Sequence, residues 1–437
     1  MADMKCAVVS TVRFPEFGCG VVRSFAGYHL AKGFSHVFLF FDDENDAGIQ
    51  IVKSNFNASQ VTVILPDSTI KTSWRMCPSY PTLKHYVKTQ VHARQRLNCE
   101  VALNIALKQG IQWLLHIDSD ELFYTPEPSV QEHFCNLERS NICQMTYLNH
   151  EGVPEAEPTD STGVDYFFET TLFRKHHSTV KMSSAASECM SFWEERRTHG
   201  QYFLAYDIGK SAVRVTQGVS TVNVHKFFVP ESKENRKSCT AILDPRHLAL
   251  ENYHNLQYPC ILHFVVCGFP WLQSKYKMLG RFPDAWYEGK VPIAPSFHLE
   301  ARDIVLDKNN NAVLKLYLDQ VMLSSSSGMK NKMMESGVCE RITGHADILK
   351  SLYGKPLWVG KTLEQNLGAE GLASGSNRTE EDVSKAPIDE KSHPQDAARK
   401  VVPKTRPGQD AAKKGTTPTM TYEKAWVIAA SINKFLK

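Results

Sequence analysis

Three acidic residues, Asp118, Asp120 and Glu121, directly follow an apolar run, residues 113–117, that is typical of a buried strand. Carboxylates at the end of a core strand cost desolvation free energy unless a positive group meets them. If the strand continues through the motif, Asp118 and Asp120 project to one side, because alternate residues of a strand share a face. Two such carboxylates are ligands for a hard divalent cation, Mg or Mn. The open positions of that cation would suit the oxygens of a diphosphate leaving group.

The composition narrows the classes of partner. Among 437 residues, Lys plus Arg number 50 and Asp plus Glu number 47, so the chain lacks the basic footprint of a nucleic-acid binder. The eleven cysteines include no CxxC pair, which argues against a structural zinc site. No apolar run approaches the ~18 residues of a membrane-spanning helix. We therefore expect a small polar partner, no nucleic acid and no membrane-spanning segment.

The elements that must position the acidic motif alternate between strand and helix. Apolar runs predict strands at 6–12, 36–41, 61–65 and 113–117, and amphipathic spacing predicts helices at 21–34 and 94–110. Short connections between such elements are typical of an α/β domain with a mainly parallel sheet flanked by helices. Ligands of these sheets bind at the carboxyl ends of the strands, where both the motif and the acidic cluster at 42–46 fall.

The second half of the chain is less regular, and its tail differs in composition. We expect strands at 166–173, 210–216, 220–229 and 260–266. Residues 367–420 are rich in Gly, Ser, Pro, Lys and Asp and bury too little apolar surface to fold, so they predict disorder. Residues 421–437 could form a short C-terminal helix.

A family resemblance rests on several segments in order. Residues 94–123, RQRLNCEVALNIALKQGIQWLLHIDSDELF, resemble the core of GT-A glycosyltransferases of the family 2-like and family 92 group. Residues 6–48, 209–227 and 261–280 resemble the opening strands, the Gly-Lys-Ser and Val-x-His segments, and the late His segment of that group. The resemblance covers about residues 5–285. It implies a Rossmann-like GT-A fold, a nucleotide-sugar donor, a glycan or other hydroxyl acceptor, and Mn or Mg as cofactor.

The resemblance also assigns residues to the donor and the metal. Asp118 and Asp120 would bind the metal and the diphosphate, with His263 as third ligand and His225 as its competitor. The donor-binding candidates are Arg13, Asp43, Arg94, Gln95, Lys210 and Lys275, with Lys277 as a further cation. For Arg13, Arg94 and Gln95 a solvated surface role is an equal alternative, and for either histidine so is a place in the core.

The general base of an inverting transfer is a carboxylate within reach of the acceptor hydroxyl. We select Asp207, directly before Ile208 and Gly209, with Glu188 and Glu169 as alternatives. Nothing in the residues fixes inversion against retention.

The expected organisation is a glycosyltransferase domain at 1–320, a helical extension at 321–366, the disordered linker at 367–420 and the helix at 421–437. Within the domain, 1–125 would bind the nucleotide sugar and 126–320 the acceptor. Members of the group commonly carry an N-terminal membrane anchor, whereas this chain begins almost at its first expected strand. Cytoplasmic and secretory-pathway locations therefore both stay open.

Two other functions compete with glycosyl transfer. A sugar-binding protein could keep the fold without catalysis. A haloacid dehalogenase-type phosphatase also places Asp-x-Asp after a strand, but it needs Thr or Val soon after the second Asp, where this chain has Glu121 and Leu122.

Overall fold

A computed structural model describes most of the chain up to residue 357. The described residues are 4–15, 18–127, 129–155, 165–230, 240–242, 258–287, 289–293, 297–324 and 328–357. All of them belong to one unit, Met1–Ser374. The expected disordered linker, the expected C-terminal helix and the end of the helical extension lie outside the described residues.

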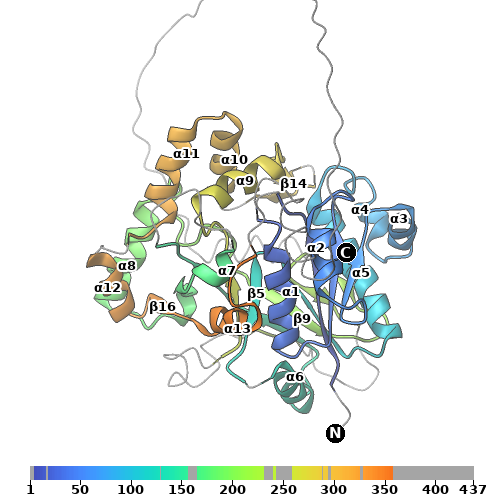
Figure 1. The fold of residues 1–437 in the computed structure, drawn as a ribbon. Coiled ribbons are helices and arrows are strands. Elements are labelled where there is room, and N and C mark those ends of the chain that lie inside the picture. Colours follow the sequence, from blue (N-terminus) through green and yellow to red (C-terminus); the bar gives the residue numbers. More distant parts are fainter. Residues whose placement is uncertain are drawn as a thin grey trace, which may run out of the picture. The chain divides into compact units, whose positions relative to one another are not determined.

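A seven-stranded, mainly parallel sheet contains the strands of the first half (Figure 1). Its order is β12 (Thr240–Ile242), β6 (Gln144–Tyr147), β9 (Lys210–Arg214), β4 (Trp113–His116), β1 (Cys6–Val12), β2 (His36–Phe41) and β3 (Val61–Ile64). β9 runs antiparallel to both of its neighbours, and the other four pairings are parallel. The expected α/β class with a mainly parallel sheet flanked by helices is confirmed.

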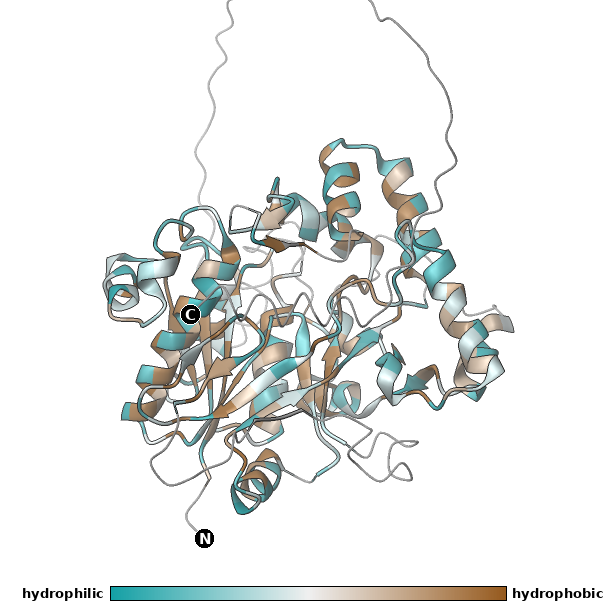
Figure 2. Cartoon of the chain, turned by 180° about the vertical axis from the view of Figure 1, so that it is seen from behind, coloured by the Kyte–Doolittle hydropathy of each residue, from teal (hydrophilic) through white to brown (hydrophobic). Residues whose placement is uncertain are grey.

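Both faces of this sheet are buried, which explains why its strands are continuous apolar runs. In β1, Cys6 and Val8 pack into one apolar core, while Ala7 and Val9 pack into the core on the opposite face. Figure 2 shows hydrophobic residues concentrated along the strands, with hydrophilic residues on the outer sides of the helices. The helices of this half are α1 (Val21–Ala31), α2 (Gly48–Asn55), α3 (Ser68–Arg75), α4 (Tyr80–Leu83), α5 (Val91–Lys108) and α6 (Val130–Arg139).

A second, five-stranded sheet packs against the apolar core that contains Cys6 and Val8 of β1. Its order is β16 (Cys339–Arg341), β8 (Leu172–Arg174), β7 (Asn149–Gly152), β13 (Cys260–His263) and β5 (Glu121–Tyr124). Residues 117–120 join β4 of the large sheet to β5 of this one. The acidic motif therefore marks the point at which the chain passes from one sheet to the other.

Further helices complete the described chain. They are α7 (Tyr166–Glu169), α8 (Ser184–Glu195), α9 (Phe269–Leu279), α10 (Phe297–Leu306), α11 (Asn310–Leu316), α12 (Gly328–Glu335) and α13 (Gly344–Tyr353). Two short hairpins, β10 (Ser220–Thr221) with β11 (Phe227–Phe228) and β14 (Ala285–Trp286) with β15 (Val291–Pro292), lie outside the main sheets. α13 packs against α1 and α7 (Figure 1). Within the described ranges, no helix combines the length and the apolar character needed to cross a bilayer.

Two expected strands are wrong. Residues 166–173 begin as helix α7, because the Asp165 side chain caps it by accepting a hydrogen bond from Phe167 N at 3.2 Å. Residues 220–229 form the β10–β11 hairpin, because Asn223 Oδ1 accepts from the N–H groups of His225 and Lys226 at 2.7 and 2.9 Å. In both places a local side-chain acceptor overrides the strand preference of the apolar residues.

A buried ion pair in the second sheet gives a stability prediction. Arg174 and Glu151 are cross-strand partners whose side chains are 2% and 0% exposed, and Arg174 NH2 donates to Glu151 Oε2. We expect Arg174→Met to lower the free energy of unfolding in urea by about 3–5 kcal/mol, because Glu151 keeps a buried charge without its cation. Lys315→Met removes an exposed pair with Asp319 and should change stability little. Equal effects of the two variants would contradict this account.

Candidate functional site

The acidic motif forms a closed turn between the two sheets. β4 ends at His116, Asp118 N donates to Glu121 Oε2 at 2.8 Å, and Glu121 N donates to Asp118 O at 3.1 Å. The strand therefore does not continue through the motif, and the condition under which both aspartates would project to one side is not met. As a consequence, Asp118 and Asp120 have different partners.

Asp118 is paired with a buried lysine. Its Oδ2 accepts from Lys210 Nζ at 2.7 Å, and its Oδ1 accepts from Gln95 Nε2 at 2.7 Å. The Lys210 side chain is only 1% exposed, whereas that of Asp118 is 27% exposed. Burial alone would raise the pKa of the Asp118 carboxyl, but the Lys210 ammonium outweighs burial and holds this pKa well below its ordinary value. The structure thus brings together three of the predicted site residues.

Asp120 is paired with the second predicted lysine. Lys275, on α9, donates from Nζ to Asp120 Oδ2 at 2.7 Å and to Val265 O at 2.8 Å. The other carboxylate oxygen, Asp120 Oδ1, lies 3.9 Å from His263 Nε2. That separation is too long for a hydrogen bond, so this oxygen and this ring nitrogen face each other without bonding.

The segment before Lys210 is fixed by buried polar groups. Asn149 donates from Nδ2 to Tyr206 O at 2.7 Å and accepts from Gly209 N at 3.2 Å. Gly209 has φ +70°, and a Cβ there would lie 2.1 Å from Tyr147 O. Only glycine fits this position, and it sets the direction in which Lys210 enters β9.

Several aromatic groups at the site carried no signal in the sequence. Tyr206 packs against the rings of His225 at 4.5 Å and His263 at 5.0 Å, and Lys210 Nζ lies 5.1 Å from its ring centroid. Its buried hydroxyl has no hydrogen-bond partner among the described residues. Burial lowers the pKa of His116, the last residue of β4, to about 3, so that ring is neutral.

Of the remaining nucleotide candidates, Arg13 lies just after β1 and Asp43 just after β2, whereas Arg94 is on α5. Arg94 on α5 forms a two-point ion pair with Asp42, at 2.5 and 2.6 Å, a pairing that had no signal in the sequence. Arg13 and Asp43 are 46% and 38% exposed and lie 3.5 Å apart. The ion pairs of these candidates are with Asp42 and with each other, not with the acidic motif.

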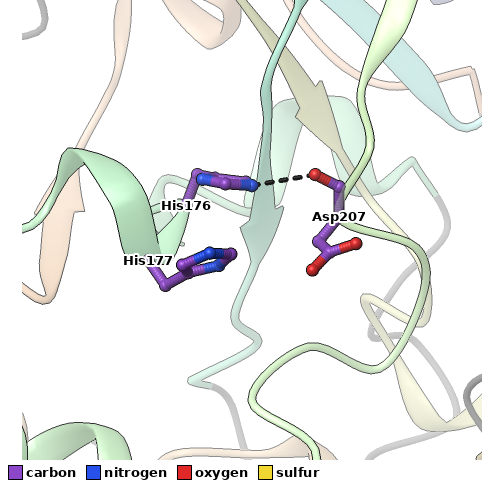
Figure 3. A group of neighbouring side chains, drawn as sticks. All are labelled: His176, His177 and Asp207. Atoms are coloured by element: carbon purple, nitrogen blue, oxygen red, sulfur yellow. Dashed lines mark hydrogen bonds between the residues drawn. The ribbon is translucent and has the colours of Figure 1, made fainter. Parts of the chain in front are cut away.

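Asp207 lies with two histidines (Figure 3). Its carboxylate lies beside the rings of His176 and His177. One possible ligand atom from each of the three residues lies within 4.8 Å of the others. In the described ranges, this is the set of three His, Cys or acidic residues that is close enough to share an ion. However, His176 Nε2 donates to Asp207 O at 2.8 Å and His176 Nδ1 accepts from Ser178 N at 3.2 Å. Both ring nitrogens are engaged, which suits a role in fixing the segment that leads to Lys210.

Four candidates remain, and each has its own neighbours. They are His225, the alternative bases Glu188 and Glu169, and Lys277. His225 Nδ1 is 2.8 Å from Gly209 O, and its ring packs edge-on against Tyr206. Glu188 on α8 pairs with Lys332. Glu169 is exposed on α7, and Lys277 is exposed on α9.

Comparison with known proteins finds relatives of one kind. No family model matches the chain. Two Arabidopsis thaliana proteins named glycosyltransferase-like are similar to it. One is 24% identical over 270 residues, 60% of this chain and 46% of the relative. The other is 23% identical over 266 residues, 60% of this chain and 53% of the relative. The chain thus spans about half the length of the curated relatives it matches.

Solved structures resemble the chain only weakly. Core-mannan synthase A of Aspergillus fumigatus, in its Mn/GDP form, is 14% identical with a TM-score of 0.23, covering 36% of this chain and 45% of that one. S. aureus TarS 1–349 in complex with UDP is 11% identical with a TM-score of 0.24, covering 80% and 92%. Similarity of this extent transfers no residue role to the present chain.

The pairing of Lys210 with Asp118 predicts a pH-dependent stability. Because the pKa of Asp118 is lower in the folded protein, the stabilisation is present above roughly pH 4, the unfolded value, and is lost as the pH falls. Lys210→Met removes the charge that most strongly opposes burial, so the pKa of Asp118 rises, and the pKa of Glu121, whose Oε2 lies 3.9 Å from Lys210 Nζ, rises further above its ordinary value. We expect the variant to be about 3–5 kcal/mol less stable at neutral pH. In urea titrations the difference from wild type should narrow toward pH 4.

Lys277→Met is the matched control, because it removes an exposed ammonium from α9. It should leave stability nearly unchanged at every pH. A difference between wild type and Lys210→Met that stays constant with pH would show that Asp118 is not the group responding.

Proposed function

We propose that the protein is a glycosyltransferase that moves a sugar from a nucleotide-sugar donor to a hydroxyl acceptor. The observation that carries the proposal is the acidic turn between the sheets, where Asp118 and Asp120 each meet a lysine and Asp120 also faces His263. Two glycosyltransferase-like proteins, which are similar to this chain over 60% of its length, support the proposal.

The residues present fit a divalent cation, Mn2+ or Mg2+, at Asp120. Asp120 Oδ1 and His263 Nε2 are 3.9 Å apart, which two metal–ligand bonds of about 2.1 Å can span. Asp118 would contribute less, because both of its oxygens already accept hydrogen bonds from Lys210 and Gln95. When bound, the cation would act as a Lewis acid on the leaving diphosphate.

The lysines would act on the same leaving group through the aspartates. Lys210 and Lys275 neutralise the two aspartates, so the positive charge that a bound cation adds would be left for a diphosphate. Arg13 and Asp43, just after β1 and β2, and Arg94 on α5 are proposed to contact the nucleotide. Asp207 remains the proposed base of an inverting transfer, with His177 close to its carboxylate.

The charges of the site predict how cation and nucleotide bind. Asp118 and Asp120 are balanced by Lys210 and Lys275, so a cation alone gains little attraction and a diphosphate brings the missing negative charge. We expect Mn2+ alone to shift the melting temperature little and Mn2+ with UDP or GDP to shift it clearly. At a free ligand concentration of about 100 times Kd, binding raises the free energy of unfolding by about 2.7 kcal/mol. A shift by nucleotide that survives a chelator would overturn the metal assignment.

Asp120→Asn tests the function itself. We expect sugar transfer from a UDP- or GDP-sugar to fall about 100-fold or more, because one ligand and the partner of Lys275 are lost together. Asp307→Asn, which changes an exposed carboxylate after α10, is the control and should keep full activity. Donor binding without transfer by the wild type would favour a non-catalytic sugar-binding protein, and no binding of any donor would reject glycosyl transfer.

A further inference from the structure

Glu121 and His263 form an unusual buried pair. They are directly opposite each other on the antiparallel strands β5 and β13, and their side chains are 0% and 5% exposed. Glu121 Oε1 and His263 Nδ1 are both buried, and neither has a hydrogen-bond partner in the described part of the chain. They face each other at 3.9 Å. Buried polar atoms without partners are rare, so these two mark a pair that a small movement would join.

The other polar atoms of Glu121 and His263 also have defined neighbours. Glu121 Oε2 accepts from Asp118 N at 2.8 Å, which fixes the carboxylate plane and leaves Oε1 for the ring. On the ring, Nδ1 faces Glu121, and Nε2 faces Asp120 Oδ1. The histidine therefore lies between two carboxylates, one on each nitrogen.

This arrangement matters for cation binding because histidine binds a metal through an unprotonated ring nitrogen. The other nitrogen must then carry the hydrogen, and it is commonly donated to a carboxylate that fixes the orientation and tautomer of the ring. For Nε2 to reach a cation beside Asp120, the hydrogen must be on Nδ1. Glu121 Oε1 is the acceptor that faces it.

We propose that Glu121 is a positioning residue that holds the hydrogen of His263 on Nδ1 and so presents Nε2 as a ligand beside Asp120. The inference rests on the proposed function, since it concerns the cation of the same donor site. It also gives Glu121 a role that differs from those of the two aspartates.

Glu121→Gln tests this role with little change of shape. Its amide oxygen must take the place of Oε2, because Asp118 N donates there. The amide NH2 group then faces Nδ1 and donates to it, which moves the hydrogen of His263 to Nε2 and blocks that nitrogen. We expect Mn2+ to bind about 10–100-fold more weakly in the presence of UDP or GDP, measured by electron paramagnetic resonance.

The control variants separate this effect from a general loss of buried charge. Glu100→Gln makes the same chemical change at a buried carboxylate that accepts from Ser79 and Thr221 instead of facing His263. It should lower the melting temperature but keep the Mn2+ affinity of the wild type. In a His263→Ala background, Glu121→Gln should cause no further loss of Mn2+ affinity, because it acts through His263.

The outcomes are decisive without an activity assay. Unchanged Mn2+ affinity in Glu121→Gln, an equal loss in the His263→Ala background, or no Mn2+ binding by the wild type would each overturn the proposal. If Glu121→Gln does not fold, the wild type decides. In its Mg2+ and UDP complex, nitrogen chemical shifts of labelled histidine should show His263 protonated at Nδ1, and protonation at Nε2 would overturn the proposal. Lack of sugar transfer would count only against the proposed function.

Discussion

The ion pair between Lys210 and Asp118 is the interaction on which the site depends. Lys210 is almost fully buried, and a buried ammonium is tolerated only when an opposite charge and further hydrogen bonds compensate its desolvation. The pair joins β9 of the large sheet to the turn between β4 and β5, so it also fixes where the two sheets meet. A single electrostatic requirement thereby sets the position of the motif and the charge of the site.

The rigidity behind this pair comes from the second sheet. Glu151 accepts from the N–H groups of Leu204 and Ala205 at 2.9 and 2.7 Å, and Asn149 holds the backbone a few residues further on. Both residues belong to β7, which pairs with β13, the strand that carries His263. One short strand therefore supports Lys210 through the chain before it and His263 through direct pairing.

The sequence predicted the central elements well, because their signals are local. Residues 6–12 and 36–41 form the expected strands without a change of boundary, since burial on both faces leaves an uninterrupted apolar run. The sequence indicated the two lysines as candidates, but it did not show which aspartate each of them would meet. Lys210 and Lys275 are 92 and 155 residues from the aspartates they meet, and no local pattern records such pairings. Asp207 is predicted as the base only from its place in the sequence. In the structure its carboxylate lies beside His176 and His177, which no sequence pattern indicated.

The spacing of the acidic motif suggested two equivalent carboxylates, and the turn makes them unequal. Asp118 has both oxygens occupied, by Lys210 and Gln95, so it serves mainly as the counterion that keeps a buried lysine charged. Asp120 has one oxygen on Lys275 and one that faces His263 without bonding. The proposed cation would therefore bind a different oxygen of Asp120 from the one that Lys275 occupies, although the lysine still weakens its attraction to the carboxylate. The lysines neutralise the carboxylates, and the unbonded oxygen and ring nitrogen are where a cation and a diphosphate could enter together.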